Sequence, residues 1–225
     1  NMASTYTPLG VELMATGENA GTWGTKTNTN LNIIEQILGG FNQVSIAGGA
    51  QTTALTISDG ATTGTAQHRM IEFTGTITGN QIVTIPLDVQ TFYVIKNSTT
   101  GAFTVQFKYV SGSGTTSTFS ATDKGTKILF AKADDATNPN IEDVLANSST
   151  INLVNQNEVR FEDASGGEYV ALKAPTTVSS NLTLTLPSAD GTSGQALTTN
   201  GSGALSFSDA GISTGKAIAM AIVFG

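Results

Sequence analysis

Short runs of alternating apolar and polar residues, separated by glycine-containing turns, fill the middle of this chain. Residues 81–87 and 103–107 alternate with a period of two, as strands with one buried face do. Residues 91–96 and 127–132 are apolar almost throughout, which suits central strands. Because turns follow these runs closely and no helix separates them, residues 46–148 are predicted to form an antiparallel, jelly-roll-like β-sandwich. The predicted strands are residues 52–58, 70–78, 81–87, 91–96, 103–107 and 127–132.

The composition supports a mainly β protein and argues against several other classes. The 36 threonines, 19 serines and 25 glycines exceed a third of the 225 residues, and threonine suits pleated, half-buried strands. Charged residues make up only 12%, too few for a helical bundle or coiled coil. With 10 basic against 17 acidic residues, we expect no nucleic-acid partner. No apolar run approaches the roughly 18 to 20 residues of a membrane helix, and no secretory signal is visible, so membrane insertion is not expected.

Residues 1–45 are predicted to be an attachment segment with one short helix. The side chains of Asn28–Asn30 can cap a helix start, and apolar residues at helical spacing follow from Leu31 to Leu38. Gly39-Gly40 is a natural stop. A helix of about ten residues is marginal alone in water, so it needs a partner surface from its own subunit, a sister subunit or another protein. The predicted contacts, at the particle or at a trimer axis, are Trp23, Leu31, Ile34 and Leu38.

Residues 149–225 form a third segment with few large apolar residues. Residues 159–162 and 168–173 are predicted to form a hairpin, and residues 182–186 alternate leucine with threonine as a strand would. Turns marked by glycine follow, with short strands between them. So few apolar residues can hardly enclose a core within one chain. The segment is therefore expected to be a β-rich module shared between subunits.

Every residue from 217 to 224, near the C-terminus, is apolar. Read as a strand, residues 217–224 have two apolar faces, and an exposed strand of this kind would aggregate. We expect it to seal a subunit interface, while a central strand within one subunit stays the alternative. The residues predicted to line the interface are Ile218, Met220, Ile222 and Phe224.

No motif of an enzyme stands out, so no catalytic residue, cofactor or metal site is predicted. The chain has no cysteine, and His68, its only histidine, lacks a recognisable nucleophile and carboxylate partner. The acidic stretch 134–143 lacks the spacing of an EF-hand and is expected to be a surface loop. Residues 21–30 contain glycines and a lysine, but not in the order of a phosphate-binding loop. Paired carboxylates that cleave a polysaccharide stay a remote option.

Two stretches resemble proteins of tailed bacteriophages, notably marine ones. Gly21-Thr22-Trp23-Gly24 followed by Asn28-Thr29-Asn30-Leu31 is similar to the N-terminal region of tail-fibre and other virion structural proteins. Residues 169–175 (YVALKAP), 182–187 (LTLTLP), 190–197 (DGTSGQAL) and 200–207 (NGSGALSF) resemble a module of phage fibre shafts. The module usually ends in tryptophan, where this chain has Phe207. The two matches cover about 80 residues, and the central domain is included only by context.

The resemblance implies a structural, non-enzymatic homotrimer that docks on the particle through its N-terminus. We therefore expect a short trimeric tail fibre or fibre-like appendage, assembled in the host cytoplasm and exposed on the virion surface, with other tail or capsid proteins as partners. A capsid decoration or head-fibre protein is one alternative. The other is a carbohydrate-binding β-sandwich that contacts host glycans through exposed tyrosines; the candidates are Tyr93, Tyr109 and Tyr169.

Overall fold

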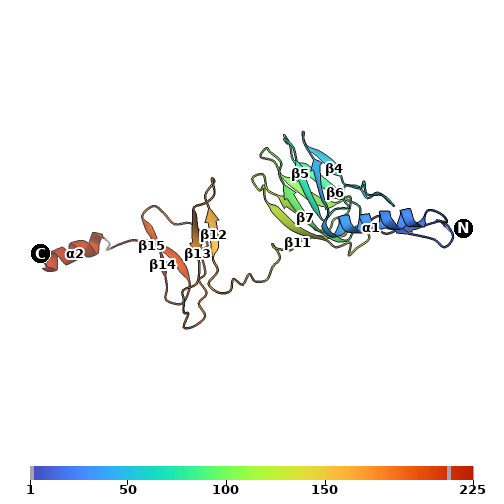
Figure 1. Cartoon of the computed structure of the whole chain (residues 1–225). Coiled ribbons are helices and arrows are strands. Elements are labelled where there is room, and N and C mark those ends of the chain that lie inside the picture. Colours follow the sequence, from blue (N-terminus) through green and yellow to red (C-terminus); the bar gives the residue numbers. More distant parts are fainter. Residues whose placement is uncertain (1–2, 212–213, 225) are drawn as a thin grey trace. The chain divides into compact units, whose positions relative to one another are not determined.

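The computed structural model describes residues 3–211 and 214–224 and divides the chain into two units (Figure 1). The N-terminal unit contains Asn1–Ile151 and the C-terminal unit Asn152–Gly225. Residues 1–45 belong to the first unit, together with the sheets. Strands outnumber helices in the element order, so the fold is mainly β, as predicted.

Three successive strand pairs build the centre of the N-terminal unit. In each pair the first strand joins one sheet, and the chain then crosses a short corner to place the second strand in the other sheet. The first strands of successive pairs run parallel to one another, and so do the second strands. The predicted antiparallel arrangement is therefore wrong for this part of the fold. The pairs are β3 (Phe41–Ser45) with β4 (Gln51–Ala54), β5 (Met70–Thr74) with β6 (Gln81–Ile85), and β7 (Thr91–Asn97) with β8 (Val105–Tyr109).

Antiparallel strands complete both sheets after β8. β9 (Ser117–Phe119) pairs with β8, while β10 (Thr126–Ala131) pairs with β7 and with β11 (Ile141–Asp143). The resulting orders are β11-β10-β7-β5-β3 for the five-stranded sheet and β4-β6-β8-β9 for the four-stranded sheet. Each predicted strand of this region overlaps an observed strand, and β4, β5 and β6 are shorter than predicted.

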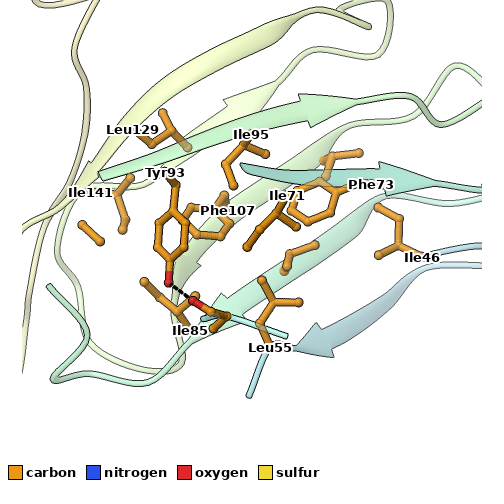
Figure 2. Close-up of a cluster of buried hydrophobic side chains, with 14 of the residues drawn as sticks. Ile46, Leu55, Ile71, Phe73, Ile85, Tyr93, Ile95, Phe107, Leu129 and Ile141 are labelled. Atoms are coloured by element: carbon orange, nitrogen blue, oxygen red, sulfur yellow. Dashed lines mark hydrogen bonds between the residues drawn. The ribbon is translucent and has the colours of Figure 1, made fainter. Parts of the chain in front are cut away.

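The core of this unit lies between the two sheets. Phe73 and Tyr93 of the five-stranded sheet and Phe107 of the four-stranded sheet are fully buried and adjacent, with ring centroids 6.5 Å (Phe73–Phe107) and 5.6 Å (Tyr93–Phe107) apart. The Tyr93 hydroxyl donates a 2.7 Å hydrogen bond to the carbonyl of Ala66, so its one polar atom is satisfied (Figure 2). Partly buried Leu9 also packs on this cluster and ties the N-terminal segment to it.

The N-terminal helix is longer than predicted. β1 (Thr5–Tyr6) and β2 (Glu12–Leu13) form a small hairpin, and α1 then spans Trp23–Gly39. Residues Asn28–Asn30 lie inside α1, so the prediction that they cap its start is wrong. The Asn30 amide instead bonds both backbone groups of Glu12, accepting from its N–H at 2.8 Å and donating to its C=O at 2.9 Å. A tertiary contact thus explains the asparagine that looked like a cap.

The C-terminal unit consists of two hairpins and a helix. The predicted hairpin is confirmed: β12 (Val159–Glu162) pairs antiparallel with β13 (Tyr169–Leu172). A second hairpin joins β14 (Gln195–Thr199) to β15 (Leu205–Asp209). Residues 182–186 are not a strand as predicted; only Thr185 forms an isolated bridge, to Ala204.

The predicted C-terminal strand is also wrong, because α2 spans Thr214–Phe224. Every second residue from 217 to 221 is alanine, the strongest helix former, and no described strand of the chain pairs with this segment. A helix satisfies most of its own backbone groups without a strand partner. Residues 212 and 213, just before it, lie outside the described residues.

Candidate interaction surfaces

One side of α1 carries an exposed apolar stripe. Trp23, Leu31, Ile34 and Leu38, all named from the sequence, are exposed. At 100° per residue the four lie within an arc of about 80°, so they form a single surface. We call these four residues the α1 stripe. The structure therefore brings this predicted group together, and the described residues of its own unit leave it uncovered.

The opposite side of α1 is held by the N-terminal hairpin. Ile33 of α1 is fully buried. The Lys26 ammonium lies 3.0 Å from the nearly buried Glu12 carboxylate, and hydrogen bonding to this ammonium is the main reason that the pKa of Glu12 is lowered. The Gln36 amide donates to the carbonyl of Thr62 at 3.1 Å. With one side fixed in this way, the α1 stripe is held facing away from the chain's own contacts.

The hairpin β12–β13 has one apolar and one polar face. Val159 is directly opposite Leu172, and Phe161 is directly opposite Val170, so the four side chains share a face. All four are exposed. We call this group the hairpin face.

The other face of the same hairpin is charged. The guanidinium of Arg160 lies 4.2 Å from the centre of the Tyr169 ring, and it forms a 2.7 Å ion pair with Glu158. This ion pair is the largest cause of the raised pKa of Arg160. The hairpin therefore has a side suited to solvent and a side suited to burial, and the described residues of its own unit cover neither.

The rest of the C-terminal unit also leaves its large apolar side chains unburied. Among residues 152–211 and the described side chains of α2, no large apolar side chain is buried. The four C-terminal residues predicted as an interface are all exposed, but on a helix they no longer share one face: Ile218 and Ile222 lie together, as do Met220 and Phe224. Other exposed apolar residues are Leu153, Val154, Val178, Leu182, Leu184, Leu186 and Leu197.

A further apolar surface, which the sequence reasoning missed, covers the outer side of the five-stranded sheet. Its residues come from β3, β5, β7 and β10 and are exposed or partly exposed. The signal was present, because residues 91–96 and 127–132 are apolar at positions on both faces, but burial on both faces explained it equally well. We call this surface the sheet face: Phe41, Met70, Phe92, Val94, Ile128 and Phe130.

The structure shows the surroundings of the residues that were weighed for chemistry. Nδ1 of His68 is buried without a hydrogen-bond partner, and burial lowers the pKa of this imidazole. In the acidic stretch, Asp135 accepts hydrogen bonds from the N–H groups of Thr137 and Asn138, which shapes the loop and lowers the pKa of Asp135. Within the described residues no group of three or more His, Asp or Glu side chains could hold a metal ion.

A polar cleft of about 640 Å³ opens beside β9, β10 and β11. Its charges are paired with one another: Lys127 lies 2.9 Å from Asp143, and Lys132 lies 3.6 Å from Glu142. No aromatic ring lines it. The cleft therefore lacks the stacking surface that a sugar site ordinarily uses.

The predicted sugar platforms are mostly wrong. Tyr93 and Tyr109 are buried in the core, where burial raises the pKa of both phenols, that of Tyr109 to about 12. Only Tyr169 is exposed, and Arg160 stacks on it.

No helix among the described residues is both long and apolar enough to cross a membrane. Comparison with family models, with curated proteins and with solved structures finds no match to this chain.

Proposed function

We propose that this chain is a structural, non-enzymatic virion protein of a tailed bacteriophage, a short homotrimeric tail fibre or fibre-like appendage. The observation that carries the proposal is the C-terminal unit, in which no described large apolar side chain is buried. The phage assignment itself depends on the resemblance of residues 21–31 and 169–207 to virion proteins.

Physical chemistry supports association of this unit with copies of itself. An isolated two-stranded hairpin is at best marginally stable in water, and the unit contains two of them without a shared core. Exposed apolar side chains on such hairpins become stabilising when they are covered. Most soluble oligomers are built from identical chains, and obligate ones often have no stable folded monomer.

The polarity of the hairpin faces favours the same arrangement. In a trimer of this kind the hairpin face points to the sister subunits, and the side with Arg160 and Tyr169 meets solvent. The N-terminal unit has its own core and presents α1 for attachment to the particle or to sister subunits. No step of this role requires a catalytic group or a cofactor.

Native mass spectrometry of the purified full chain tests the proposal. We expect a species of three chains that persists at low micromolar concentration. A second arm asks for the position on the particle: purified virions should contain the chain in a multiple of three copies, visible as a three-fold symmetric projection in cryo-electron microscopy. A stable single chain, or particles without the protein, would contradict the proposal.

A further inference from the structure

The outer faces of the two sheets in the N-terminal unit differ sharply in chemistry. One row of directly opposite residues on the four-stranded sheet reads Thr52, Ile82, Gln106 and Thr118, three of them polar. This is the ordinary composition of a solvated sheet face.

On the outer face of the five-stranded sheet, the comparable row is apolar. Phe41, Met70, Val94 and Ile128 are directly opposite one another across four neighbouring strands. Next to this row Phe92 stacks on Phe130, with ring centroids 4.7 Å apart. The sheet face is therefore continuous, and no described residue of the N-terminal unit covers it.

Polar and charged residues border the sheet face on two sides. On one side Glu72 accepts a 2.7 Å hydrogen bond from Gln43 and pairs with Lys96 at 3.4 Å. On the other side Lys132 pairs with Glu142, which is opposite Phe130. An apolar centre with a polar rim is typical of a protein–protein interface.

Within the described part of the N-terminal unit, α1 does not cover the sheet face. Trp23, Leu31, Ile34 and Leu38 of the α1 stripe are 64%, 58%, 40% and 67% exposed, and Phe41, Phe92 and Ile128 of the sheet face are 53%, 46% and 38% exposed. Only Gly40 separates α1 from β3, and the contacts of α1 with Glu12 and Thr62 fix its direction. The described residues of the N-terminal unit thus cover neither surface.

Three-fold symmetry requires two such surfaces. In a closed ring of three, one patch of each subunit contacts a different patch of the next, whereas a two-fold dimer needs only one self-complementary patch. An apolar helix stripe and an apolar sheet face are the surfaces that pack together in layered folds. We propose that the α1 stripe of one copy packs on the sheet face of the next copy around the trimer, an inference that rests on the proposed homotrimer.

The areas agree with this assignment. With about 200 Å² for a fully exposed large side chain, the α1 stripe offers about 460 Å² and the three most exposed residues of the sheet face offer about 270 Å². Together they give an apolar core of about 730 Å² for each interface. Because apolar atoms make up about 60% of such interfaces, the whole contact would bury about 1,200 Å², the lower end of the range for stable complexes.

The absence of cysteine makes a direct test possible. The full-length variant Ile34→Cys/Ile128→Cys places one thiol in the α1 stripe and one in the sheet face. The control Ile34→Cys/Ile82→Cys moves the second thiol to the opposite outer face, where Ile82 is 36% exposed and therefore closely matches Ile128. Each variant is treated with a short bismaleimide cross-linker and analysed on a denaturing gel, and its native mass is measured in parallel.

We expect covalent trimers from the first variant and single chains from the control. The thiol introduced at position 128 should also react with a monofunctional maleimide at least tenfold more slowly than the thiol introduced at position 82. If the native mass shows a trimer but the two thiols react equally fast, the inference is wrong while the proposed trimer stands. Cross-linking of the single variant Ile128→Cys to itself would also overturn it, in favour of a two-fold contact. A single-chain native mass for the unsubstituted protein would contradict both proposals.

Discussion

Replacing Phe161 by alanine should weaken the assembly far more than it changes the single chain. Phe161 lies in the hairpin face and is 59% exposed in one chain. About 120 Å² of its side chain is thus available for burial between subunits, which at about 25 cal/mol per Å² is worth about 3 kcal/mol per chain. Three copies lose about 9 kcal/mol per trimer, or about a millionfold in the dissociation constant. Because the midpoint concentration of a monomer–trimer equilibrium varies as the square root of that constant, it should rise about a thousandfold.

Sedimentation velocity over a dilution series measures this midpoint directly. The matched control is Tyr169→Ala, which removes an exposed aromatic ring from the opposite face of the same hairpin, where Arg160 stacks on it. An exposed cation–π contact is worth about 0.5 to 1 kcal/mol, so the control should move the midpoint by no more than about tenfold. If both variants shift it equally, or if Phe161→Ala shifts it less than tenfold, the hairpin face does not point to the sister subunits.

Two further predictions concern the N-terminal unit. The hydroxyl of Tyr109 donates to the carbonyl of Val89 and accepts from the N–H of Ala133, both at 2.8 Å, whereas that of Tyr93 has one partner. Tyr109→Phe should therefore lower the free energy of unfolding by about 2 to 4 kcal/mol and Tyr93→Phe by about 1 to 2 kcal/mol in urea denaturation, and the reverse order would refute this reasoning. Hydrogen bonds from neighbouring side chains lower the pKa of Glu72 from 4.5 to about 2, so its stabilising effect should be complete above pH 4.5 and disappear as the pH falls towards 2. The difference in melting temperature between the unsubstituted protein and Glu72→Gln should shrink over that range, and a difference independent of pH would exclude the carboxylate as its source.

The positions of the central strands could be predicted from the sequence, but their partners could not. A period of two is a local property, so residues 81–87 and 103–107 reveal strands without any knowledge of the fold. Whether a strand turns back in its own sheet or crosses to another depends on the corner that follows it. At Gly48 and Thr76 the corners themselves pair with the next corner, which keeps successive strands parallel. No residue pattern along a single strand records this.

The interaction surfaces could be predicted only in part, because a local sequence pattern shows which residues share a side but not whether that side is covered. Leu31, Ile34 and Leu38 of the α1 stripe were found because helical spacing shows which residues share a side. Trp23 lay before the predicted helix and joins them because α1 begins there. The C-terminal residues were found as apolar, but alternation of large residues with alanine suits both a strand and a helix. The sheet face was missed because an apolar residue at a strand position is ordinarily buried.

The parallel stacking of the three successive strand pairs also determines how such a unit can gain further pairs. Phe41 pairs with Met70, 29 residues further on, and Met70 pairs with Val94, 24 residues further on, so each level of the stack uses a similar length of chain. Each level contacts mainly the levels next to it, and no described strand pairs with the outer edge of the first level, β3 with β4, in either sheet. Duplication of one such segment would therefore add a level without redesign of the others, as in solenoid proteins. Short polar strands such as β4, which reads Gln-Thr-Thr-Ala, keep that open end from capturing a foreign strand.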